Sequence, residues 1–576
     1  MKVLLVHPED SIPSSSRSHR WDLIIDCARA PASSYEAWSK QTACPILSLY
    51  QFAQEIEDLH LCRRILGGGF GTLLDRYGID WWDVLSLRLV PDLLRLIAVE
   101  RAVRFINSSC ELYATRSFPV ANAFQNTLQC RLTEMQTRIG RIRANAQHSF
   151  RVLSKLDPTQ ISQVIQDKFD RHHAIRSRFS RRRVRSKDNF ILLPSAYVNV
   201  SRTAVRYAQL LPSEQFLLVL ARQNARLKAT PPNVVMHGLD SYFGRLPQDD
   251  RELCGYWNQL RQKLIEQDST FRMADTAGIL DGVGAELRWC LSIRDAWLNL
   301  LEEHVITGCM SADDTNPYTR IPLLLAKKRG IPTVACHHGA FDCGMAIKGE
   351  AADFYLAKTE MEYDYLVRKC RVDAEKVVLG GTAPAAYPSL QPSKSSGQPD
   401  WMVFFTEPYE ASHWRDEEIY RDLLPKLRFL AENSGLQLVF KLHPFESVKG
   451  HRRMLRRILG GSSRGMHVLA GPITDDLWRK TKFALTVQSS AALECAERGV
   501  PVFLLSWLRD PYTGYVPQYA SFQIGYTLRC AEEIKNIPQV LSGYGWQKPA
   551  RQEPMDAGRL KSLLTGKVMF PMAVNS

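Results

Sequence analysis

Two groups of polar residues in the second half of the chain stand directly after apolar stretches, at spacings that suit anion binding. Lys441 and His443 lie two positions apart at the end of the predicted strand 436–441, so in an extended chain their side chains share one face. Ser489 and Ser490 follow a second apolar stretch. Ammonium, imidazole and hydroxyl groups donate hydrogen bonds to phosphate oxygens, and charge-assisted donors contribute ~1.5–3 kcal/mol each. These four side chains predict a phosphate site.

The elements that must position the serines can be read from the surrounding pattern. Residues 483–487 and 500–505 are short apolar runs typical of buried parallel strands, and the small residues at 491–496 have helical spacing. Ser489 and Ser490 then stand at the N-cap of a helix. Free backbone N–H groups and the positive end of the helix dipole favour an anion there.

Each group has a structural alternative when it is taken alone. Ser489 can serve only to cap its helix, and a His-Pro pair such as His443-Pro444 after a strand is commonly structural, since Pro444 ends that strand. Together they favour a functional site, because the carboxyl ends of parallel strands meet at one edge of a sheet.

A similar arrangement is predicted in the preceding half of the chain. Residues 305–308 and 331–336 are expected to be strands, joined by a helix that polar residues at 311–317 open. His338 and Gly339 follow the second strand, so we expect the histidine to face a cleft while the backbone turns at the glycine. A buried structural histidine is the alternative, which fits the neighbouring His337 better than His338.

Transfer chemistry at a phosphate site also needs a group that removes a proton from the incoming nucleophile. Five imidazole or carboxylate groups stand at predicted strand ends and are candidates. They are Glu9, Asp10, Asp313, Asp314 and His338. We prefer His338, with Asp10 next, and keep Asp313 as a third candidate.

The phosphate motifs resemble a known group of enzymes. Residues 441–444 (Lys-Leu-His-Pro) and 489–491 (Ser-Ser-Ala), followed by Glu494 and residues 499–501 (Gly-Val-Pro), are similar to the donor-domain motifs of GT-B glycosyltransferases that build bacterial surface polysaccharides. The nearest patterns are those of polysialyltransferases and of CDP-glycerol glycerophosphotransferase-like enzymes. The resemblance covers roughly residues 300–510, motif by motif.

The resemblance implies specific roles. His443, Ser489 and Ser490 would hold the phosphate of a nucleotide, with Lys441 and Glu494 in the same donor site, and the reaction would invert the anomeric carbon. The acceptor side has no counterpart in the motifs and stays open.

Length and composition allow two large domains, and the resemblance implies an α/β fold of two Rossmann-like domains that face each other across a cleft. The 576 residues, 45% of them hydrophobic, suffice for two large cores. We expect an N-terminal acceptor domain at 1–386 with helical insertions near 131–187 and 240–275, a linker at 387–400, and a donor-binding domain with the C-terminal tail at 401–576.

A net charge of +14 indicates an anionic partner. The first insertion ends in a dense basic run that includes Arg181, Arg182, Arg183 and Arg185. This run could contact an anionic membrane or an acidic polymer, or it could be solvated surface. Nucleic acid is less favoured, because no helix-turn-helix, RNP or zinc pattern accompanies it.

The expected activity is transfer of a sugar from a nucleotide, CMP-, CDP- or UDP-linked, to a hydroxyl of a surface polysaccharide or lipid-linked glycan. No cofactor is expected, and no metal, because no D-x-D triplet follows a strand. The alternatives are a polyol-phosphate transferase, a nucleotide-sugar epimerase, or a non-catalytic basic scaffold or nucleic-acid-binding protein.

The location expected from the sequence is the cytoplasm, with the inner face of the membrane as an open alternative. No signal peptide precedes the first strand, and no apolar window is long enough to span a bilayer. The scattered cysteines show no metal-binding spacing and are interpreted as reduced thiols.

Overall fold

The computed structural model describes most of the chain. Its described residues are those outside 13–20, 55–56, 63–72, 107–108, 136–188, 223–224, 244–248, 340–350, 381–398, 410–413, 445, 461–464, 510–515, 547–553 and 567–576. The predicted linker lies almost wholly outside them. So do the basic run at Arg181, Arg182, Arg183 and Arg185 and nearly all of the insertion at 131–187.

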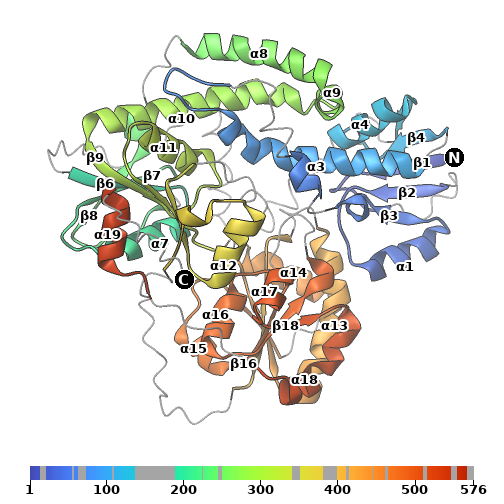
Figure 1. The fold of residues 1–576 in the computed structure, drawn as a ribbon. Coiled ribbons are helices and arrows are strands. Elements are labelled where there is room, and N and C mark those ends of the chain that lie inside the picture. Colours follow the sequence, from blue (N-terminus) through green and yellow to red (C-terminus); the bar gives the residue numbers. More distant parts are fainter. Residues whose placement is uncertain are drawn as a thin grey trace, which may run out of the picture.

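Three sheets of exclusively parallel strands organise the described residues (Figure 1). The first sheet has the order β3-β2-β1-β4-β5. Its strands are β1 (Lys2–Val6), β2 (Leu23–Asp26), β3 (Ile46–Ser48), β4 (Glu111–Ala114) and β5 (Leu132–Glu134). The α/β prediction is confirmed, and the range 1–386 contains two of the three sheets.

The middle sheet has seven strands in the order β12-β11-β10-β9-β6-β7-β8. They are β6 (Asn189–Ser195), β7 (Phe216–Leu220), β8 (Val234–Gly238), β9 (Val305–Ser311), β10 (Thr333–Ala335), β11 (Phe354–Ala357) and β12 (Val377–Leu379). The chain builds this sheet outward from β6 in one direction and then from β9 in the other.

The third sheet has six strands in the order β15-β14-β13-β16-β17-β18. They are β13 (Trp401–Phe405), β14 (Gln437–Lys441), β15 (Met466–Leu469), β16 (Thr481–Thr486), β17 (Val502–Leu505) and β18 (Tyr526–Leu528). In sequence order this is 3-2-1-4-5-6, the doubly wound arrangement. The strand order reverses between β13 and β16, so the carboxyl ends of these two strands border a crevice.

Helices cover the sheets and connect them. Those of the N-terminal half are α1 (Ala32–Thr42), α3 (Trp82–Ile106), α4 (Pro119–Leu128), α7 (Val198–Ala208), α8 (Asp249–Gln267), α9 (Ser269–Thr276), α10 (Val283–Glu303), α11 (Pro317–Lys328) and α12 (Glu360–Asp364). Those of the C-terminal half are α13 (Asp416–Ser434), α14 (Val448–Ile458), α15 (Asp475–Lys480), α16 (Ala491–Arg498), α17 (Val516–Ser521), α18 (Ile537–Gly543) and α19 (Ala557–Thr565).

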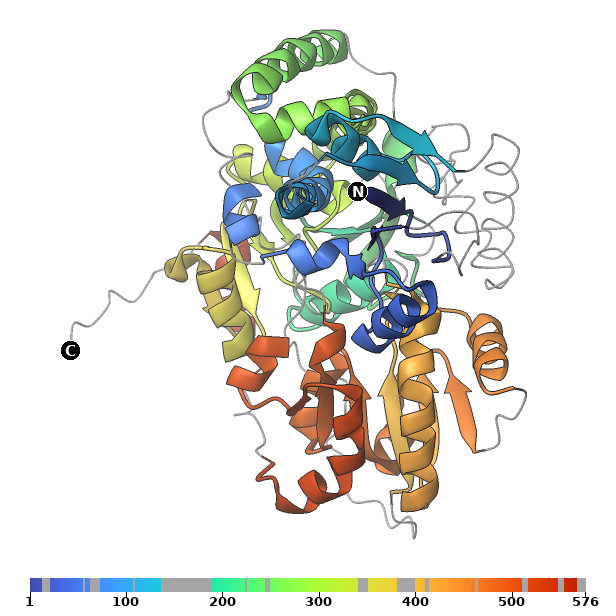
Figure 2. The same ribbon diagram turned by 90° about the vertical axis from the view of Figure 1, so that its right-hand side faces the viewer.

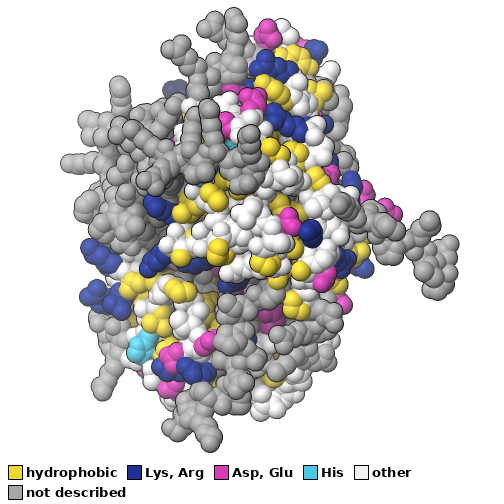
Figure 3. Space-filling view, turned by 90° about the vertical axis from the view of Figure 1, so that its left-hand side faces the viewer, with side chains coloured by type: hydrophobic (Ala, Val, Ile, Leu, Met, Phe, Trp, Pro, Cys, Tyr) yellow, Lys and Arg dark blue, Asp and Glu magenta, His cyan; other side chains and the backbone are white. Residues whose placement is uncertain are grey.

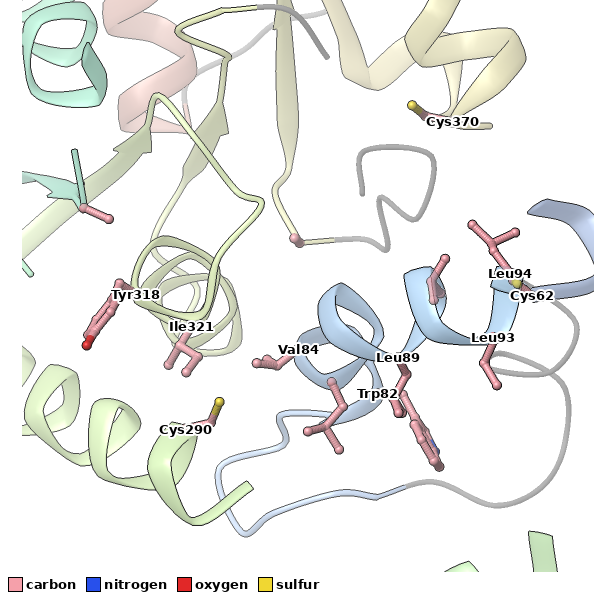
Figure 4. Close-up of a cluster of buried hydrophobic side chains, with 14 of the residues drawn as sticks. Cys62, Trp82, Val84, Leu89, Leu93, Leu94, Cys290, Tyr318, Ile321 and Cys370 are labelled. Carbon is pink, nitrogen blue, oxygen red and sulfur yellow. The ribbon is translucent and has the colours of Figure 1, made fainter. Parts of the chain in front are cut away.

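Helix α3 joins the first and middle sheets into one core. It continues through Pro91 as a single helix, and its buried residues reach both ends. In Figure 4, Val84 of α3 points toward Ile321 of α11 and Cys290 of α10, which both belong to the middle sheet's layer. The same cluster includes Val3 and Leu5 of β1. The range 1–386 is thus held together by apolar packing as well as by the chain.

Two contacts tie distant parts of the chain together. Arg415, at the start of α13, donates to both carboxylate oxygens of the buried Asp26 at distances of 2.6 and 2.9 Å. In Figure 2 the blue helix α1 accordingly lies against the orange α13.

The last described helix, α19, packs on β9 and β10 of the middle sheet, although it follows the third sheet in sequence. A β-carbon on Gly308 would lie 2.5 Å from the carbonyl oxygen of Leu564, so this approach requires glycine.

The surface carries both signs of charge. On the face shown in Figure 3, described Lys and Arg side chains occupy several places between hydrophobic and acidic ones. No helix among the described residues is long and apolar enough to cross a bilayer. The described cysteines are free thiols.

Candidate functional site

The two predicted phosphate motifs lie side by side at the carboxyl edge of the third sheet. Residue 405 of the central strand β13 pairs with Lys441 of β14 on one side and with Thr486 of β16 on the other. The loops that follow β14 and β16 therefore flank the end of β13. This is the edge at which the reversal of strand order opens a crevice.

His443 stands directly beyond β14, and its side chain is partly buried. Burial lowers the pKa of His443 to about 4, and the charges of His338 and Lys441 act in the same direction. The side chain is therefore neutral near pH 7. In that form it presents one N–H donor and one acceptor nitrogen.

Lys441 takes a different position from the one that its spacing suggests. Its ammonium group donates to the carbonyl oxygens of Gly471, at 2.7 Å, and Leu442, at 3.2 Å. Burial lowers the pKa of Lys441, while the charges of Glu446 and Glu494 oppose this effect. Two of its three N–H donors are used within the third sheet, so Lys441 contributes mainly a positive charge beneath the loop.

The serine turn opens helix α16 as predicted, with the two hydroxyl groups in different roles. The Ser489 hydroxyl accepts the backbone N–H of Ala491 at 3.3 Å, and its carbonyl accepts the hydroxyl of the buried Tyr519. Ser490 occupies the N-cap position without a side-chain capping bond. Within the described residues its hydroxyl forms no hydrogen bond, so it can donate to a ligand at the positive end of the helix.

Three residues that the sequence analysis missed support these loops from below. Glu446 accepts the backbone N–H of His443 at 2.9 Å and a short hydrogen bond from the hydroxyl of Thr406. Glu407 accepts the backbone N–H of Gln488 at 2.7 Å. Thr406 and Glu407 follow the apolar strand β13 and precede a proline. This pattern resembles that of residues 441–444 and could have identified them.

Burial raises the pKa of both carboxyl groups. That of Glu407 rises to about 7, opposed by hydrogen bonds from the Gln488 backbone and the Thr486 hydroxyl. That of Glu446 also rises to about 7, opposed by the Thr406 hydroxyl and the His443 backbone. Part of each population is therefore protonated near neutral pH.

On the middle sheet, His338 lies in the turn that follows β10. Its Nδ1 atom is 3.4 Å from the carbonyl oxygen of Ala312, an acceptor, so Nδ1 carries the proton and Nε2 has a free lone pair. Burial lowers the pKa of His338, although the charge of Asp313 and the Ala312 carbonyl oppose it. A neutral imidazole of this tautomer can act as a proton acceptor at Nε2.

The turn around His338 is fixed by its neighbours. His337 is buried, with Nδ1 3.2 Å from the Gly339 nitrogen and Nε2 3.9 Å from a carboxylate oxygen of Asp313. Lys358, at the end of β11, donates to the Gly339 carbonyl at 3.2 Å and pairs with the buried Glu362 at 3.1 Å. His337 thus has the structural position and His338 the more exposed one. Lys358 is a further residue that the sequence analysis missed.

The middle and third sheets face each other across this edge. A β-carbon built on Gly339 would lie 4.0 Å from the Ser490 hydroxyl. A positive charge on His338 would lower the pKa of His443 further, so the two imidazoles lie within range of electrostatic interaction. The structure therefore brings His338, His443 and Ser490 together from two different sheets.

Glu494 lies on α16 at the side of this region. Burial raises its pKa, while Arg498 on its own helix and Lys358 and Arg206 of the middle sheet's layer lower it. Its negative charge also raises the pKa of Lys441, against the effect of burial. Glu494 therefore sits among cations from both sheets.

Asp313 supports the site indirectly. Its carboxylate accepts hydrogen bonds from the Thr315 backbone at 2.9 Å and from the Asn316 side chain at 2.7 Å. These bonds shape the start of α11, and the buried carboxylate lies behind the two histidines of the turn. The geometry gives Asp313 a positioning role for the histidine pair.

Asp10 is engaged elsewhere, at the carboxyl edge of the first sheet. Its carboxylate pairs with Arg116, which also donates to Glu9 at 3.2 Å, and its carbonyl accepts the Arg415 guanidinium at 2.7 Å. Burial works to raise the pKa of Asp10, but the hydrogen bonds from Arg116 and Thr115 outweigh it, so the net shift is downward. Asp10 therefore belongs to the contact between the first and third sheets.

The assembled groups can carry out two halves of a transfer reaction. The third sheet supplies donors for an anion, from the α16 N-terminus, the Ser490 hydroxyl and His443, with the Lys441 charge behind them. The middle sheet supplies a neutral imidazole at His338. Among the described residues, no cluster of three or more His, Cys, Asp or Glu side chains could hold a metal ion.

No protein-family model matches the chain, and no curated protein matches it. Several solved structures do resemble it. MnaA from S. aureus in a co-structure with UDP is 12% identical, with coverage of 66% of this chain and 96% of MnaA and a TM-score of 0.40.

Two further solved structures have a similar degree of likeness. The UDP-GlcNAc 2-epimerase of Methanocaldococcus jannaschii, in complex with UDP-GlcNAc and UDP, is 13% identical over 66% of this chain and 99% of that chain, with a TM-score of 0.41. Arabidopsis thaliana UGT89C1, complexed with UDP-L-rhamnose, is 10% identical over 66% of this chain and 94% of that chain, with a TM-score of 0.38. Similarity at this level transfers neither a reaction nor a substrate.

Proposed function

We propose that the protein transfers a sugar from a nucleotide-activated donor to a hydroxyl group of a glycan acceptor. The observation that supports this most directly is the approach of His338 and Gly339 of the middle sheet to Ser490 and His443 of the third sheet. A transferase needs both a site that stabilises the departing nucleotide phosphate and a base for the incoming hydroxyl, and these two needs map onto the two sheets.

The donor phosphate is assigned to the N-terminus of α16. There the Ser490 hydroxyl and the helix dipole meet the phosphate from one side and the neutral His443 from the other. Negative charge grows on the phosphate oxygen as the bond to the sugar breaks. Donors fixed in advance, in a place shielded from water, stabilise that charge without reorganisation.

His338 is assigned as the base. Its Nε2 lone pair would take the proton of the acceptor hydroxyl while the sugar moves from the phosphate oxygen to the acceptor oxygen. Asp313, behind the histidine pair, would stabilise the imidazolium that results. The proton ends on His338 and the electron pair of the broken bond ends on the nucleotide phosphate, so the step is balanced. Inversion at the anomeric carbon and independence from metal ions are part of this proposal.

The first test is direct. The purified protein is screened by thermal shift against CMP, CDP, UDP, GDP and their sugars, since a ligand at 100 times its dissociation constant adds ~2.7 kcal/mol of stability. The stabilising nucleotide sugar is then supplied in radiolabelled form with a membrane extract that provides glycan acceptors. Label in a polymer or lipid-linked fraction supports transfer.

The other outcomes identify the alternatives. Conversion of the donor to its epimer without any acceptor would mean an epimerase, and label that moves only from a CDP-polyol would mean a polyol-phosphate transferase. Absence of any nucleotide effect would leave a non-catalytic scaffold and would sink the proposal. His467 of β15 offers a matched control, because it stacks on Trp401 in the same sheet away from both loops. His443→Ala should reduce transfer by roughly 10- to 100-fold at low donor concentration, and His467→Ala should not reduce it.

A further inference from the structure

We propose that Thr406, Glu407 and Glu446 form a brace that holds the His443 loop and the serine turn in one fixed geometry, so that the two halves of the anion site act as a unit. We call these three side chains the carboxylate brace. The inference rests on the proposed function, because it concerns how the donor site is kept in shape. The three side chains are positioning residues, which support the loops through their backbones.

The position of β13 in the sheet makes such a brace possible. In the order β15-β14-β13-β16-β17-β18, β13 is the strand that borders both β14 and β16. Its last residue, Phe405, pairs with Lys441 on one side and Thr486 on the other. Side chains at the next two positions, Thr406 and Glu407, can therefore reach both loops.

One arm of the brace holds the His443 loop. Glu446 Oε2 accepts the His443 backbone N–H at 2.9 Å and the Thr406 hydroxyl in a short hydrogen bond. The same hydroxyl lies 3.3 Å from the His443 nitrogen, and the Thr406 backbone N–H donates to the Lys441 carbonyl at 3.1 Å. The loop is thus attached to the end of β13 at several points.

The other arm holds the serine turn. Glu407 Oε1 accepts the Gln488 backbone N–H at 2.7 Å and lies 3.4 Å from the Thr486 hydroxyl. That hydroxyl in turn accepts the Ser489 N–H at 3.2 Å. Gln488, which precedes the two serines, is therefore held by Glu407, which follows Thr406. The two arms are joined through the single peptide bond between Thr406 and Glu407, directly after β13.

A purely structural explanation is less economical. A hydroxyl or an amide oxygen can accept a backbone N–H without a buried carboxylate, and an ionisable group away from water is costly unless it is well paired. Here two carboxyl groups lie beneath the proposed phosphate. A carboxyl group can also accept several hydrogen bonds at once, as Glu446 does from the His443 N–H and the Thr406 hydroxyl, and this fixes the donors above it. A displacement of ~1 Å in such a site can cost about a hundredfold in rate.

The brace predicts that a change at Glu407 is felt at His443, although the hydrogen bonds of Glu407 go to the other arm, at Thr486 and Gln488. Hydrogen–deuterium exchange measures this without any ligand. In Glu407→Ala, peptides covering 441–446 and 486–490 should both exchange faster than in the wild type. In Glu407→Gln, which keeps an acceptor oxygen, both should stay close to the wild-type rates. Glu432→Gln is the control, because Glu432 forms an exposed ion pair with Arg428 on α13.

Nucleotide binding supplies the second readout. For the nucleotide that gives the largest thermal shift, Glu407→Ala should weaken binding at least about tenfold, and Glu407→Gln should restore most of it. A double-mutant cycle of Glu407→Ala with His443→Ala should show coupling, because the two changes damage one unit. If Glu407→Ala does not fold, Thr406→Val takes its place as the variant that breaks the brace, because it removes the hydroxyl. Thr406→Ser and Glu407→Gln, which keep the hydroxyl and an acceptor oxygen, are then the variants that should preserve it.

The outcomes separate the two proposals. If the wild type binds no nucleotide, the proposed function fails, and the exchange experiment still decides on the brace. If exchange in Glu407→Ala rises only at 486–490, or if the two substitutions in the cycle are additive, the brace is overturned while the proposed function stands. Faster exchange at both loops together with a positive coupling supports it.

Discussion

Gly339 of the middle sheet and Ser490 of the third sheet approach so closely that a β-carbon on the glycine would lie 4.0 Å from the serine hydroxyl. That distance is an ordinary van der Waals contact, so a methyl group at residue 339 would just touch Ser490. The approach of these two residues therefore limits what can lie between the two sheets at this point.

A graded series at Gly339 tests this constraint. Gly339→Ala should change nucleotide affinity by less than about threefold, because its methyl group fits, whereas Gly339→Val should weaken binding by more than about tenfold through filling the gap. Isothermal titration calorimetry with the stabilising nucleotide measures both. Equal affinity for the valine variant would show that the nucleotide does not lie between these residues.

His443→Ala should weaken nucleotide binding by roughly 10- to 100-fold, since it removes a donor worth ~1.5–3 kcal/mol to a charged group. The melting temperature should change little, because the imidazole is neutral in the folded protein. His467→Ala is the matched control and should bind as the wild type does. If His443→Ala binds the nucleotide as tightly as the wild type, His443 is not part of the donor site.

His338 should act on the rate and leave donor binding largely intact. A general base contributes ~10²–10⁴-fold, so His338→Ala should lower kcat by that range with little change in KM for the nucleotide sugar. Steady-state kinetics of transfer separate the two parameters. His338→Asn tests whether hydrogen bonding alone suffices, and a kcat near the wild-type value in either variant would place the base elsewhere.

Nucleotide binding should become tighter as the pH falls from about 8.5 to 6.5. Glu407 and Glu446, with pKa values of about 7, take up protons in this window and lose the negative charge beneath the phosphate. His443, with its pKa near 4, and His338, whose pKa is lowered from its ordinary value, stay neutral in the free protein over this range. Phosphate groups with a second pKa near ~6 remain largely dianionic there.

Titration of binding in Glu407→Gln provides the comparison for that pH dependence. With one titrating carboxyl removed, the slope of log Kd against pH between 6.5 and 8.5 should become shallower. An unchanged slope would mean that the nucleotide itself, or another group, is responsible.

The same two carboxyl groups make a prediction about stability. Each has a higher pKa in the folded protein than the ordinary value of 4.5, so it binds its proton more tightly when folded. Their favourable contribution is complete below about pH 4.5 and is lost as the pH rises through about 7. Urea unfolding across pH 5 to 8 should show this loss in the wild type and less of it in Glu446→Gln.

Arg415→Ala should destabilise the contact between the first and third sheets. The guanidinium pairs with Asp26, whose side chain is fully buried, and removal of one partner of a buried pair costs ~3–5 kcal/mol. Arg428→Ala, which breaks an exposed pair with Glu432, should cost ~0–1 kcal/mol. Denaturant unfolding measures the free energy of unfolding of both variants. If the two substitutions lower it equally, the Arg415–Asp26 pair is not important for stability.

The local elements were largely predictable from the sequence. Apolar runs around 436–440 and 483–487 are strands, and the small residues at 491–496 form the helix that the serines open, because these signals lie within a few residues of one another. The approach of His338 to His443 depends on how two sheets pack. No periodicity in a single sequence specifies that packing.

The side-chain partners of Lys441 and Asp10 were not predictable, for a similar reason. Lys441 has the spacing of a phosphate ligand, but the carbonyl of Gly471 in the next loop is near enough to take its ammonium. Asp10 stands at a strand end like the other candidates, yet Arg116, far away in sequence, pairs with it. Such partners come from distant segments and become visible only when the sheets are assembled. Glu407 was missed for the opposite reason, since its local pattern was present and was not recognised.

The return of the chain from the third sheet to the middle sheet has a mechanical consequence. Because α19 packs on β9 and β10, the backbone crosses between these two layers twice, once between β12 and β13 and once between α18 and α19. This double connection, together with the Arg415–Asp26 pair, restrains the position of the third sheet relative to the other two more than a single connection does. It therefore favours one constant position of Ser490 opposite Gly339.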